Sequence, residues 1–467
     1  MPRSFFTQIL FPILSGILFI NCSNSQNNIS DGYWIEAGKI ESQIIPPVFK
    51  DAVYDIKNFG AIGDGLFDCT EAIKQAIVEC NKNGGGKILV PEGIYLTGAI
   101  HLLSNVNLHL EENAVIKFST DPKKYLPLVF TRWEGVECMN YSSLIYAYDQ
   151  ENIAITGKGI LDGQAANENW WSWKGRKEFG WVDGMPEQSN GRNKLFEFGE
   201  NNFPVRERIL GEGFYLRPNF IQFYKSKNIL VEGVTLKDSP MWFINPALCS
   251  NVTFKDLKVE GMGPNNDGID PESCDNVLIE NCYFNNGDDC IAIKSGRNND
   301  GRRVNVPSKN IIIKNCKMKN GHGGVVIGSE ISGGANNIFV KDCIMDSPEL
   351  DRAIRIKTNS VRGGKIENIF VKNLEVGEVK EAILKINFFY EEGDAGSFTP
   401  TVENIVMENI QSKKSDYAIW IKAYERSKAK NISIYNSEFN KVTNNNILEN
   451  VESITLSNVR INSELIK

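Results

Sequence analysis

A nine-residue unit recurs along the chain and predicts the fold. Three copies of it are Asn276-Val-Leu-Ile-Glu-Asn-Cys-Tyr-Phe284, Asn310-Ile-Ile-Ile-Lys-Asn-Cys-Lys-Met318 and Asn337-Ile-Phe-Val-Lys-Asp-Cys-Ile-Met345. Related segments start at residues 228, 251, 368, 404, 431 and 453, and a weaker copy starts at residue 152. Successive starts from 228 to 453 lie 22 to 36 residues apart. Apolar residues alternate with polar ones, which is the periodicity of short β-strands. Self-similarity at this spacing indicates a solenoid of repeated strand units.

The repeats predict an all-β fold, a single-stranded right-handed parallel β-helix. A unit this short cannot bury its own apolar face, so neighbouring units must stack with strands about 4.8 Å apart. The seventh position of each unit should then form a ladder that faces inward. Its members are Val234, Leu257, Cys282, Cys316, Cys343, Leu374, Ile410, Ser437 and Val459. Cysteine behaves there as a small apolar side chain, so we expect core packing at these positions rather than redox chemistry.

Asparagine begins eight of these nine units, and the remaining unit begins with serine. We expect this residue to turn the chain, with its side-chain amide bonded to backbone groups of the adjacent coils. The ten cysteines of the chain are scattered without a Cys-x-x-Cys pair, which argues against a zinc site.

The N-terminal residues have the pattern of an export signal. Arg3 precedes an apolar run from Phe5 to Ile20, and a polar segment follows. We predict a signal peptide over residues 1–22, with Cys22 resembling the acceptor of a bacterial lipoprotein, and a linker over 23–50. The protein is then expected in the periplasm, anchored to the outer membrane, or secreted in soluble form.

Residues 51–467 are predicted to form one β-helix domain with two additions. Asp68 to Lys82 has apolar residues at helical spacing and a plausible Asp or Thr cap, so it predicts a helix that closes the N-terminal end of the solenoid. Between residues 163 and 219 the repeat lapses into an aromatic-rich insertion that includes Trp170 to Trp181. This insertion either walls one end of a groove or packs on the coil.

The overall charge limits the classes of partner. The formal net charge is −7, so the chain lacks the basic balance expected for binding a nucleic-acid backbone. We predict no nucleic-acid partner, no cofactor and a monomeric protein. An anionic ligand would need a local basic patch, and two short stretches supply one: Lys294, Arg297, Arg302 and Arg303, and then Arg352, Arg355, Lys357 and Arg362.

Three carboxylates are predicted to meet on one outward surface. Asp267 and Asp289 are 22 residues apart, which matches the shortest spacing between units, so they should stand on adjacent coils. Asp288 and Asp289 can both face outward only if the chain bends near Gly287. Crowded carboxylates repel, so at least one pKa should rise, which lets an acid and a base coexist. Glycoside hydrolysis uses such a pair, whereas calcium binding is the competing use of acidic clusters.

Four short motifs resemble those of the polygalacturonase family, glycoside hydrolase family twenty-eight. They are Asn265-Asn266-Asp267, Gly287-Asp288-Asp289, Gly321-His322-Gly323 and Arg355-Ile356-Lys357, and Tyr390 is similar to a later family tyrosine. Asn266 stands where the first motif usually has threonine. Because the flanking Asn265 and Asp267 are kept, this difference bears on the substrate subsites and not on the chemistry. The stretches 296–303, 328–334 and 357–364 resemble the bacterial branch that acts from chain ends.

The resemblance implies roles for individual residues. Asp288 would be the general acid of an inverting hydrolysis, Asp267 and Asp289 would activate water, and His322 would support the acid, without a metal. Arg355, Lys357 and Tyr390 would bind galacturonate at and around the cleaved bond. Asn265 and three cations of the basic stretch, Lys294, Arg297 and Arg302, are further candidates for substrate binding. The partner would be pectic galacturonan, cleaved by a galacturan 1,4-α-galacturonidase that removes units from the non-reducing end.

Other functions remain open at this point. Within the family, the alternatives are an endo-polygalacturonase and a rhamnogalacturonan hydrolase. A pectate lyase would use the same fold with calcium, and a non-catalytic glycan-binding solenoid would use the aspartates only to cap turns. The lyase predicts an unsaturated product and loss of activity with a chelator, and the glycan-binding solenoid predicts that function survives the loss of Asp288.

Overall fold

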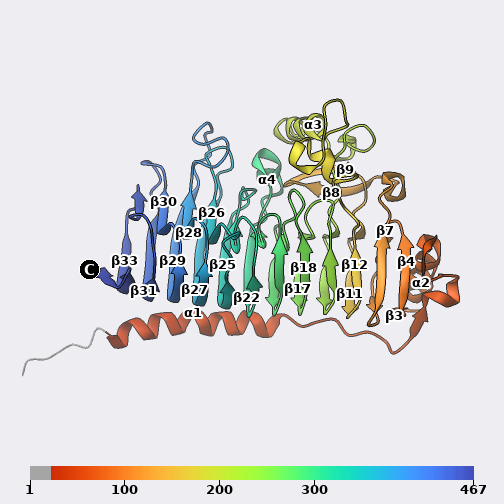
Figure 1. Ribbon diagram of the computed structural model, residues 1–467, viewed down its shortest axis with the longest axis horizontal. Helices are drawn as coiled ribbons and strands as arrows, with labels where there is room; N and C mark the ends of the chain where they lie inside the picture. The colour runs from red at the N-terminus through yellow and green to blue at the C-terminus, as the bar shows by residue number, and fades with distance from the viewer. Residues whose placement is uncertain (1–22, 467) are drawn as a thin grey trace, which may run out of the picture.

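The computed structural model describes residues 23–466. The predicted signal peptide and Cys22 lie outside these residues. Parallel strands stack along one long axis, as the repeats predicted, and form a right-handed parallel β-helix (Figure 1). Among the described residues, no helix combines the length and the apolar character needed to span a bilayer.

The larger of the two wall sheets, which we call the long sheet, runs the whole length of the solenoid. Its strands are β1 (Val53–Asp55), β2 (Asp64–Asp68), β3 (Gly86–Val90), β4 (Gly93–Thr97), β6 (Val106–Leu110), β7 (Ala114–Phe118), β11 (Glu151–Gly157), β12 (Ile160–Asp162), β14 (Lys227–Glu232), β15 (Thr235–Lys237), β17 (Ser250–Lys255), β18 (Lys258–Gly261), β19 (Asp275–Glu280), β20 (Tyr283–Asn286), β22 (Ser308–Lys314), β23 (Lys317–Met318), β25 (Ala335–Met345), β27 (Lys365–Glu378), β29 (Thr401–Lys414), β31 (Lys430–Phe439), β33 (Ile454–Ile461) and β34 (Glu464–Ile466). Apart from the pair β33–β34, these strands pair in parallel.

The opposite wall, which we call the site sheet, carries the functional residues. Its strands are β5 (Ile100–His101), β10 (Ile145–Tyr148), β13 (Ile221–Tyr224), β16 (Ile244–Ala247), β21 (Ile291–Ile293), β24 (Val325–Ile327), β26 (Arg352–Lys357), β28 (Ala382–Asn387), β30 (Tyr417–Lys422) and β32 (Ile447–Glu449). Bridges from Ile269 to Ile244 and to Ile291 join the first four strands to the last six. Consecutive coils therefore present one continuous outward face.

The inward ladder predicted from the seventh repeat position is confirmed. All nine of its members are at most 3% exposed. None of the nine cysteines that the structure describes forms a disulfide, and all nine are buried. The cysteines of the ladder therefore fill the core, as their positions predicted.

The asparagine ladder differs from the prediction in its bonding partner. The leading asparagines have a left-handed backbone, for example φ 56° at Asn228 and 55° at Asn251, and so they turn the chain. Their side-chain amides bond mainly to a side chain of the preceding coil, although Asn251 also donates to the backbone carbonyl of Ile45. Asn251 Nδ2 donates to Asn228 Oδ1 at 2.8 Å, and Asn228 Nδ2 donates to Asn152 Oδ1 at 2.9 Å. Where asparagines stack one coil apart, each amide lies opposite its own kind, which pairs a donor with an acceptor; at Asn310 the partner is Asp275 instead.

Helix α2 (Thr70–Lys82) closes the N-terminal end of the solenoid, as predicted. Asp68 accepts hydrogen bonds from the amide and hydroxyl of Thr70, so the helix begins two residues later than expected. Its apolar face, which includes Ile73 and Ile77, is buried against the first coils.

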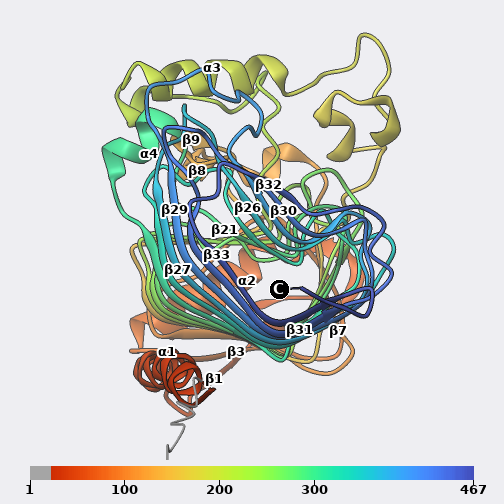
Figure 2. The same ribbon diagram turned by 90° about the vertical axis from the view of Figure 1, so that its left-hand side faces the viewer.

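The segment predicted to be a linker contains a helix instead. Helix α1 (Ser23–Gln43) runs along the outside of the long sheet, on the side of the molecule opposite the insertion (Figures 1 and 2). Ala37, Ile40 and Ile44 pack against outward apolar residues of the coils, and the ring of Tyr33 stacks on Phe370 with centroids 4.1 Å apart. These coils carry a stripe of apolar residues on their outward face, and the helix packs on it. The alternation within the repeats did not predict this stripe.

The insertion stands above the site sheet on a small core of its own (Figure 1). It contains α3 (Ser189–Glu200) and the short turns η3 (Trp171–Lys174), η4 (Lys177–Phe179) and η5 (Val205–Glu207). The antiparallel hairpin β8 (Val129–Trp133) and β9 (Val136–Asn140) lies beneath α3, and the short helix α4 (Asn298–Val304) lies beside it. Leu195 of α3 packs with Trp133 and Cys138 of the hairpin.

Candidate active site

The predicted catalytic residues come from successive turns on the site sheet. Asp267 precedes the bridge at Ile269, and Asp288 and Asp289 precede β21. His322 precedes β24 on the following coil. The backbone amide of Gly268 donates to the carbonyl of Asp289 at 3.0 Å, so the first two turns are directly adjacent. The repeat spacing therefore predicted correctly that these residues lie together on adjacent turns. Asp267, Asp288 and His322 line the cavity described below, whereas the side chain of Asp289 is fully buried.

Gly287 allows the bend that brings two neighbouring aspartates to the same surface. A Cβ at this position would lie 2.6 Å from the carbonyl oxygen of Gly263, so only glycine fits against the previous coil. The amide of Asn286 donates to the carbonyl of Asp289 at 3.2 Å and fixes the turn after the bend.

The three carboxylates form one compact cluster. Asp267, Asp288 and Asp289 each offer an oxygen within 4.8 Å of the others. Burial, together with the neighbouring charges of Asp270 and Asp288, raises the pKa of Asp267 well above its ordinary value. The prediction that crowding raises at least one carboxyl pKa is therefore met at Asp267.

Asp288 shares a proton with His322. The Nδ1 atom of His322 lies 2.9 Å from Oδ1 of Asp288. Burial tends to raise the pKa of Asp288, but the hydrogen bond and charge of His322 outweigh it, and the pKa lies below its ordinary value. The same hydrogen bond raises the pKa of His322 above 6.5. Between these two pKa values the pair holds one proton at the rim of the site, since the His322 side chain is 54% exposed.

Buried cations balance the carboxylates. Lys357 Nζ lies 2.7 Å from Oδ2 of Asp289, and Arg355 lies 3.5 Å from Oδ1 of the same residue. Burial tends to lower the pKa of Lys357, but the charge of Asp289 outweighs it and raises this pKa. The ring of Tyr390 lies 5.2 Å from Lys357 Nζ. Arg355, Lys357 and Tyr390 thus come together beside the catalytic cluster, as predicted.

Lys294 lies on the other side of the cluster. Its Nζ atom is 3.8 Å from Asp267 and Asp270 and 3.2 Å from Glu330. Burial opposes the charge of this ammonium, but the surrounding carboxylates raise its pKa well above the usual value. Lys294 therefore neutralises the acids beneath the cluster.

The two asparagines of the first motif have different surroundings. Asn265 lines the cavity, and its Oδ1 accepts hydrogen bonds from Lys174 at 2.6 Å and from Arg217 at 2.8 Å. Asn266 is fully buried and bonds to the amide of Gly263 and to two backbone carbonyls. The residue that departs from the family pattern therefore supports the loop and does not face the substrate.

Two residues predicted to bind substrate lie outside the cavity lining. Arg297 is 4% exposed and forms ion pairs with Glu330, Glu391 and Glu392. Arg302 donates to two backbone carbonyls of the neighbouring loop and lies over the ring of Phe398, 3.4 Å from its centroid. The cationic stretches contain just one acid in sequence, Asp300, but the fold supplies further acids from distant loops, so these charges hold the loops together.

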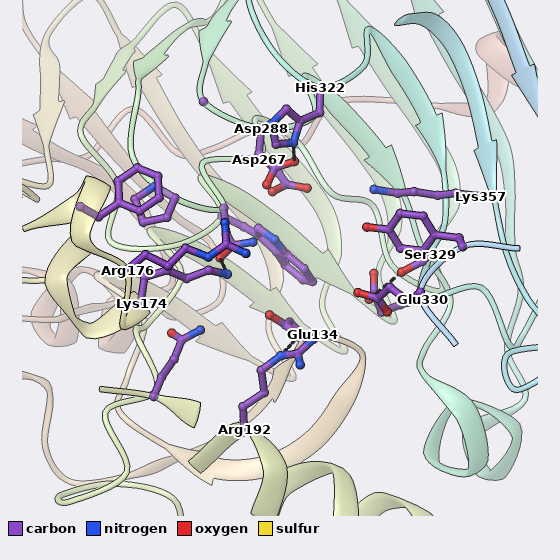
Figure 3. Close-up of a pocket in the computed structure, with 18 of the residues that line it drawn as sticks. Glu134, Lys174, Arg176, Arg192, Asp267, Asp288, His322, Ser329, Glu330 and Lys357 are labelled. Carbon is purple, nitrogen blue, oxygen red and sulfur yellow. Dashed lines mark hydrogen bonds and ion pairs between the residues drawn. The ribbon is translucent and has the colours of Figure 1, made fainter. Parts of the chain in front are cut away.

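The site lies in a cavity of about 780 Å³ whose wall comes from the insertion. Lys174, Arg176 and Arg192 project into it from one side, and Lys357 lies on the other (Figure 3). Tyr390, next to Lys357, also lines the cavity. Burial and the nearby charge of Arg217 lower the pKa of Lys174 to about 8. Trp170 itself is buried in the core, so the two predicted roles of the insertion are divided between its residues. Trp170, Trp171 and Trp173 pack on the coil, and the residues after them, among them Lys174, Arg176 and Phe179, form the wall.

Sequence reasoning missed several residues of this cavity, among them Glu134, Lys174, Arg176, Arg192, Trp242 and Glu330. Arg192 and Glu134 form an ion pair of 2.8 Å across the base of the wall. Lys174 directly follows the tryptophan cluster, which was the one available signal, but nothing in the sequence showed which way the loop would fold.

The acidic cluster also has the spacing of a cation site. Oxygens of Asp267, Asp288 and Asp289 within 4.8 Å of one another are close enough to share a divalent ion. Lys357 and Arg355 contact Asp289, and Lys294 lies near Asp267, so protein cations already offset this charge. This arrangement favours acid–base chemistry over calcium binding.

The chain is similar to known proteins over the part that contains these site residues. The model of glycosyl hydrolases family 28 matches residues 212–459, which include all four motifs and Tyr390. A probable polygalacturonase of Vitis vinifera is 30% identical over 352 residues, which cover 73% of this chain and 62% of that protein. An exo-poly-alpha-D-galacturonosidase of Dickeya chrysanthemi is 26% identical over 76% of this chain and 62% of that protein. The chain thus spans less than two thirds of the length of both relatives.

A solved structure is similar over almost the whole solenoid. The hyperthermoactive exopolygalacturonase from Thermotoga maritima has a TM-score of 0.89 and 45% sequence identity. The match covers 92% of this chain and 97% of that one.

Proposed function

Because the chain belongs to glycosyl hydrolase family 28, we propose that it hydrolyses the α-1,4 linkages of galacturonan and releases galacturonate from the non-reducing end. The observation that carries this proposal is a walled cavity lined by Asp267 and Asp288 together with Lys357 and Arg355, with the buried Asp289 within 4.8 Å of both acids. The acids supply the chemistry of glycoside cleavage, and the cations suit a substrate that carries a carboxylate on every unit.

In the proposed reaction, Asp288 gives the proton that it shares with His322 to the glycosidic oxygen. The bond between that oxygen and the anomeric carbon breaks, and a water adds to the carbon while its proton passes to Asp289. Asp267, next to both, holds the water. Lys357 and Arg355 bind a galacturonate carboxylate beside the cleaved bond, and Tyr390 packs next to it.

The wall of the cavity supports action at a chain end. Lys174 and Arg176 lie in the cavity opposite its far wall and come from the insertion (Figure 3), and we infer that this wall stops a polymer from continuing in that direction. The terminal galacturonate would occupy the walled part, with cationic side chains near its carboxylate. The similarity to the Thermotoga exopolygalacturonase supports the same direction of attack.

The spacing of the carboxylates and the family resemblance point to different stereochemical outcomes at the anomeric carbon, so the anomer of the product must be measured. Oxygens within 4.8 Å are nearer to the separation of about 5–5.5 Å usual for retaining enzymes than to the about 6.5–9.5 Å of inverting ones. The inverting route follows from the family resemblance. Inversion of an α-linkage must release β-galacturonate first, and proton NMR of the early product detects that anomer directly.

One incubation tests the substrate, the direction and the reaction class together. With polygalacturonate and an oligomer labelled at its reducing end, we expect free galacturonate and labelled products that shorten by one unit at a time. Chelation of divalent cations should leave the rate unchanged, and no unsaturated product absorbing in the ultraviolet should form. Mid-chain fragments would indicate endo-action, whereas a chelator-sensitive, absorbing product would indicate a lyase.

We also propose that the protein is exported and anchored through a lipid on Cys22. The apolar run before Cys22 supports this, as does a polymeric substrate too large to enter a cell. Fractionation of expressing bacteria should find the wild type with the outer membrane and the Cys22→Ser variant in the soluble exported fraction. Equal fractionation of both would contradict the anchor.

A further inference from the structure

The outward face of the site sheet continues past the cavity toward the C-terminal end. Strand pairing places Arg355 beside Lys385 and Lys385 beside Trp420, one coil apart in each step. A parallel row runs from Lys357 through Asn387 to Lys422. The residues between these rows, Ile356, Ile386 and Ile421, are fully buried, so the two rows project outward.

Trp420 lies on this face between two ammonium groups. Its ring is partly exposed, with Lys385 Nζ 4.4 Å and Lys422 Nζ 5.5 Å from its centroid. Lys385 is held by an ion pair with Glu381, and Lys422 by one of 2.9 Å with Glu449. The indole therefore has a fixed position in the row that begins at the proposed substrate-binding arginine.

The wall that the insertion forms indicates the direction in which a bound galacturonan chain extends from the cavity. The insertion lines the cavity on the side of Lys174 (Figure 3), so we infer that the remaining part of a bound chain extends away from it, over β26, β28 and β30. Adjacent strands lie about 4.8 Å apart, a distance close to the length of one α-linked pyranose unit. A chain that extends along this face would therefore place about one galacturonate on each coil.

The chemistry of the row matches that of the polymer. A pyranose ring presents axial C–H groups that pack on an aromatic face, and an indole offers the largest such surface. Ammonium groups on either side suit the carboxylate that each galacturonate carries. A ring held between two cations at this spacing fits a uronate better than a neutral sugar.

We propose that Trp420, flanked by Lys385 and Lys422, is a binding platform for the reducing-end part of the galacturonan chain. Counting one unit per coil, the unit against the wall is followed by units at Arg355, at Lys385 and at Trp420. Trp420 thus binds the fourth unit from the non-reducing end, and it favours long substrates over short ones. This inference rests on the proposed galacturonan hydrolysis.

The test compares Trp420→Ala with wild type on galacturonate oligomers of two, three, four and more units. We expect kcat/KM to fall about tenfold for substrates of four or more units, as expected for loss of one aromatic contact. The value for the dimer should stay unchanged, because the dimer does not reach β30. Trp420→Tyr, which keeps an aromatic face, should restore most of the preference for long chains.

Tyr435→Ala is the matched control, because Tyr435 is a half-buried aromatic residue on β31 of the long sheet. It should leave every chain length unaffected. Thermal unfolding of each variant separates a folding defect from a binding defect. In an Asp288→Asn background, calorimetry of dimer and tetramer binding gives the same comparison without turnover.

The outcomes separate the platform from the proposed function. A wild type that cleaves no galacturonide overturns the function itself. If the wild type cleaves oligomers, two results would overturn the platform alone. Trp420→Ala could act on tetramers as well as the wild type does, or it could be impaired equally on dimers and tetramers. A loss confined to four or more units, restored by Trp420→Tyr, supports it.

Discussion

The Asp288→Asn variant should lose at least about a hundredfold in kcat on galacturonan while keeping its fold. Asparagine has nearly the shape of aspartate and can still contact His322, but it cannot give a proton to the leaving oxygen. The measurement is turnover of a short oligomer at saturating concentration, together with the affinity for the same oligomer. We expect the affinity to change little, because Lys357 and Arg355 supply the contacts to the carboxylate.

Asp416→Asn is a suitable control, since Asp416 is exposed on the turn before β30 and away from the cavity. Its turnover should equal that of the wild type. If Asp288→Asn kept full turnover, the assignment of the acid and the hydrolase proposal would both be wrong. If neither protein turned over substrate but both bound it equally, the chain would be a glycan-binding solenoid whose aspartates only cap turns.

Replacing His322 with glutamine should lower kcat about ten- to a hundredfold and move the alkaline limb of the pH–rate profile to lower pH. In the wild type, the proton leaves the pair only as pH rises through the pKa of His322, which the hydrogen bond to Asp288 raises above 6.5. Without His322, Asp288 must hold the proton alone. Burial favours that proton, but the charges of Lys357 and Lys294 oppose it, so the carboxyl group releases it at lower pH than a histidine whose pKa is raised.

The measurement is kcat/KM across the pH range, which reports the acid and the base of the free enzyme. His109→Gln is the matched control, because His109 bonds to Thr156 on the long sheet, away from the cavity, and burial lowers its pKa. That variant should keep the wild-type profile. An unchanged alkaline limb in His322→Gln would show that His322 only positions the acid and carries none of its proton.

The repeat and the catalytic coils could be predicted because both signals are local. Alternation within nine residues identified the inward positions, from Val234 to Val459, without any knowledge of their neighbours. The interval from Asp267 to Asp289 equals one short coil, and one coil moves a residue directly beside its predecessor. Gly287 showed where the strand had to bend.

Residues whose role depends on distant loops could not be predicted in this way. Arg297 looked available to an anion because acids were scarce in its own stretch, yet Glu391 and Glu392 reach it from almost a hundred residues away. Helix α1 was taken for a linker because its apolar residues match a stripe on coils that lie more than two hundred residues later. Trp420 gave no signal, since its alignment with Arg355 crosses loops of unequal length.

Strand periodicity in the sequence was enough to predict the β-helix and its inward ladder, because it sets which side chains face outward. It also predicted the coils that carry Asp267, Asp288, Asp289 and His322, because stacking sets which residues are neighbours. The tertiary structure alone decided which cations are neutralised, which loop closes the cavity and where a long substrate can continue. Those features depend on irregular loops that cross several coils, and the length of such a loop does not determine the direction in which it folds.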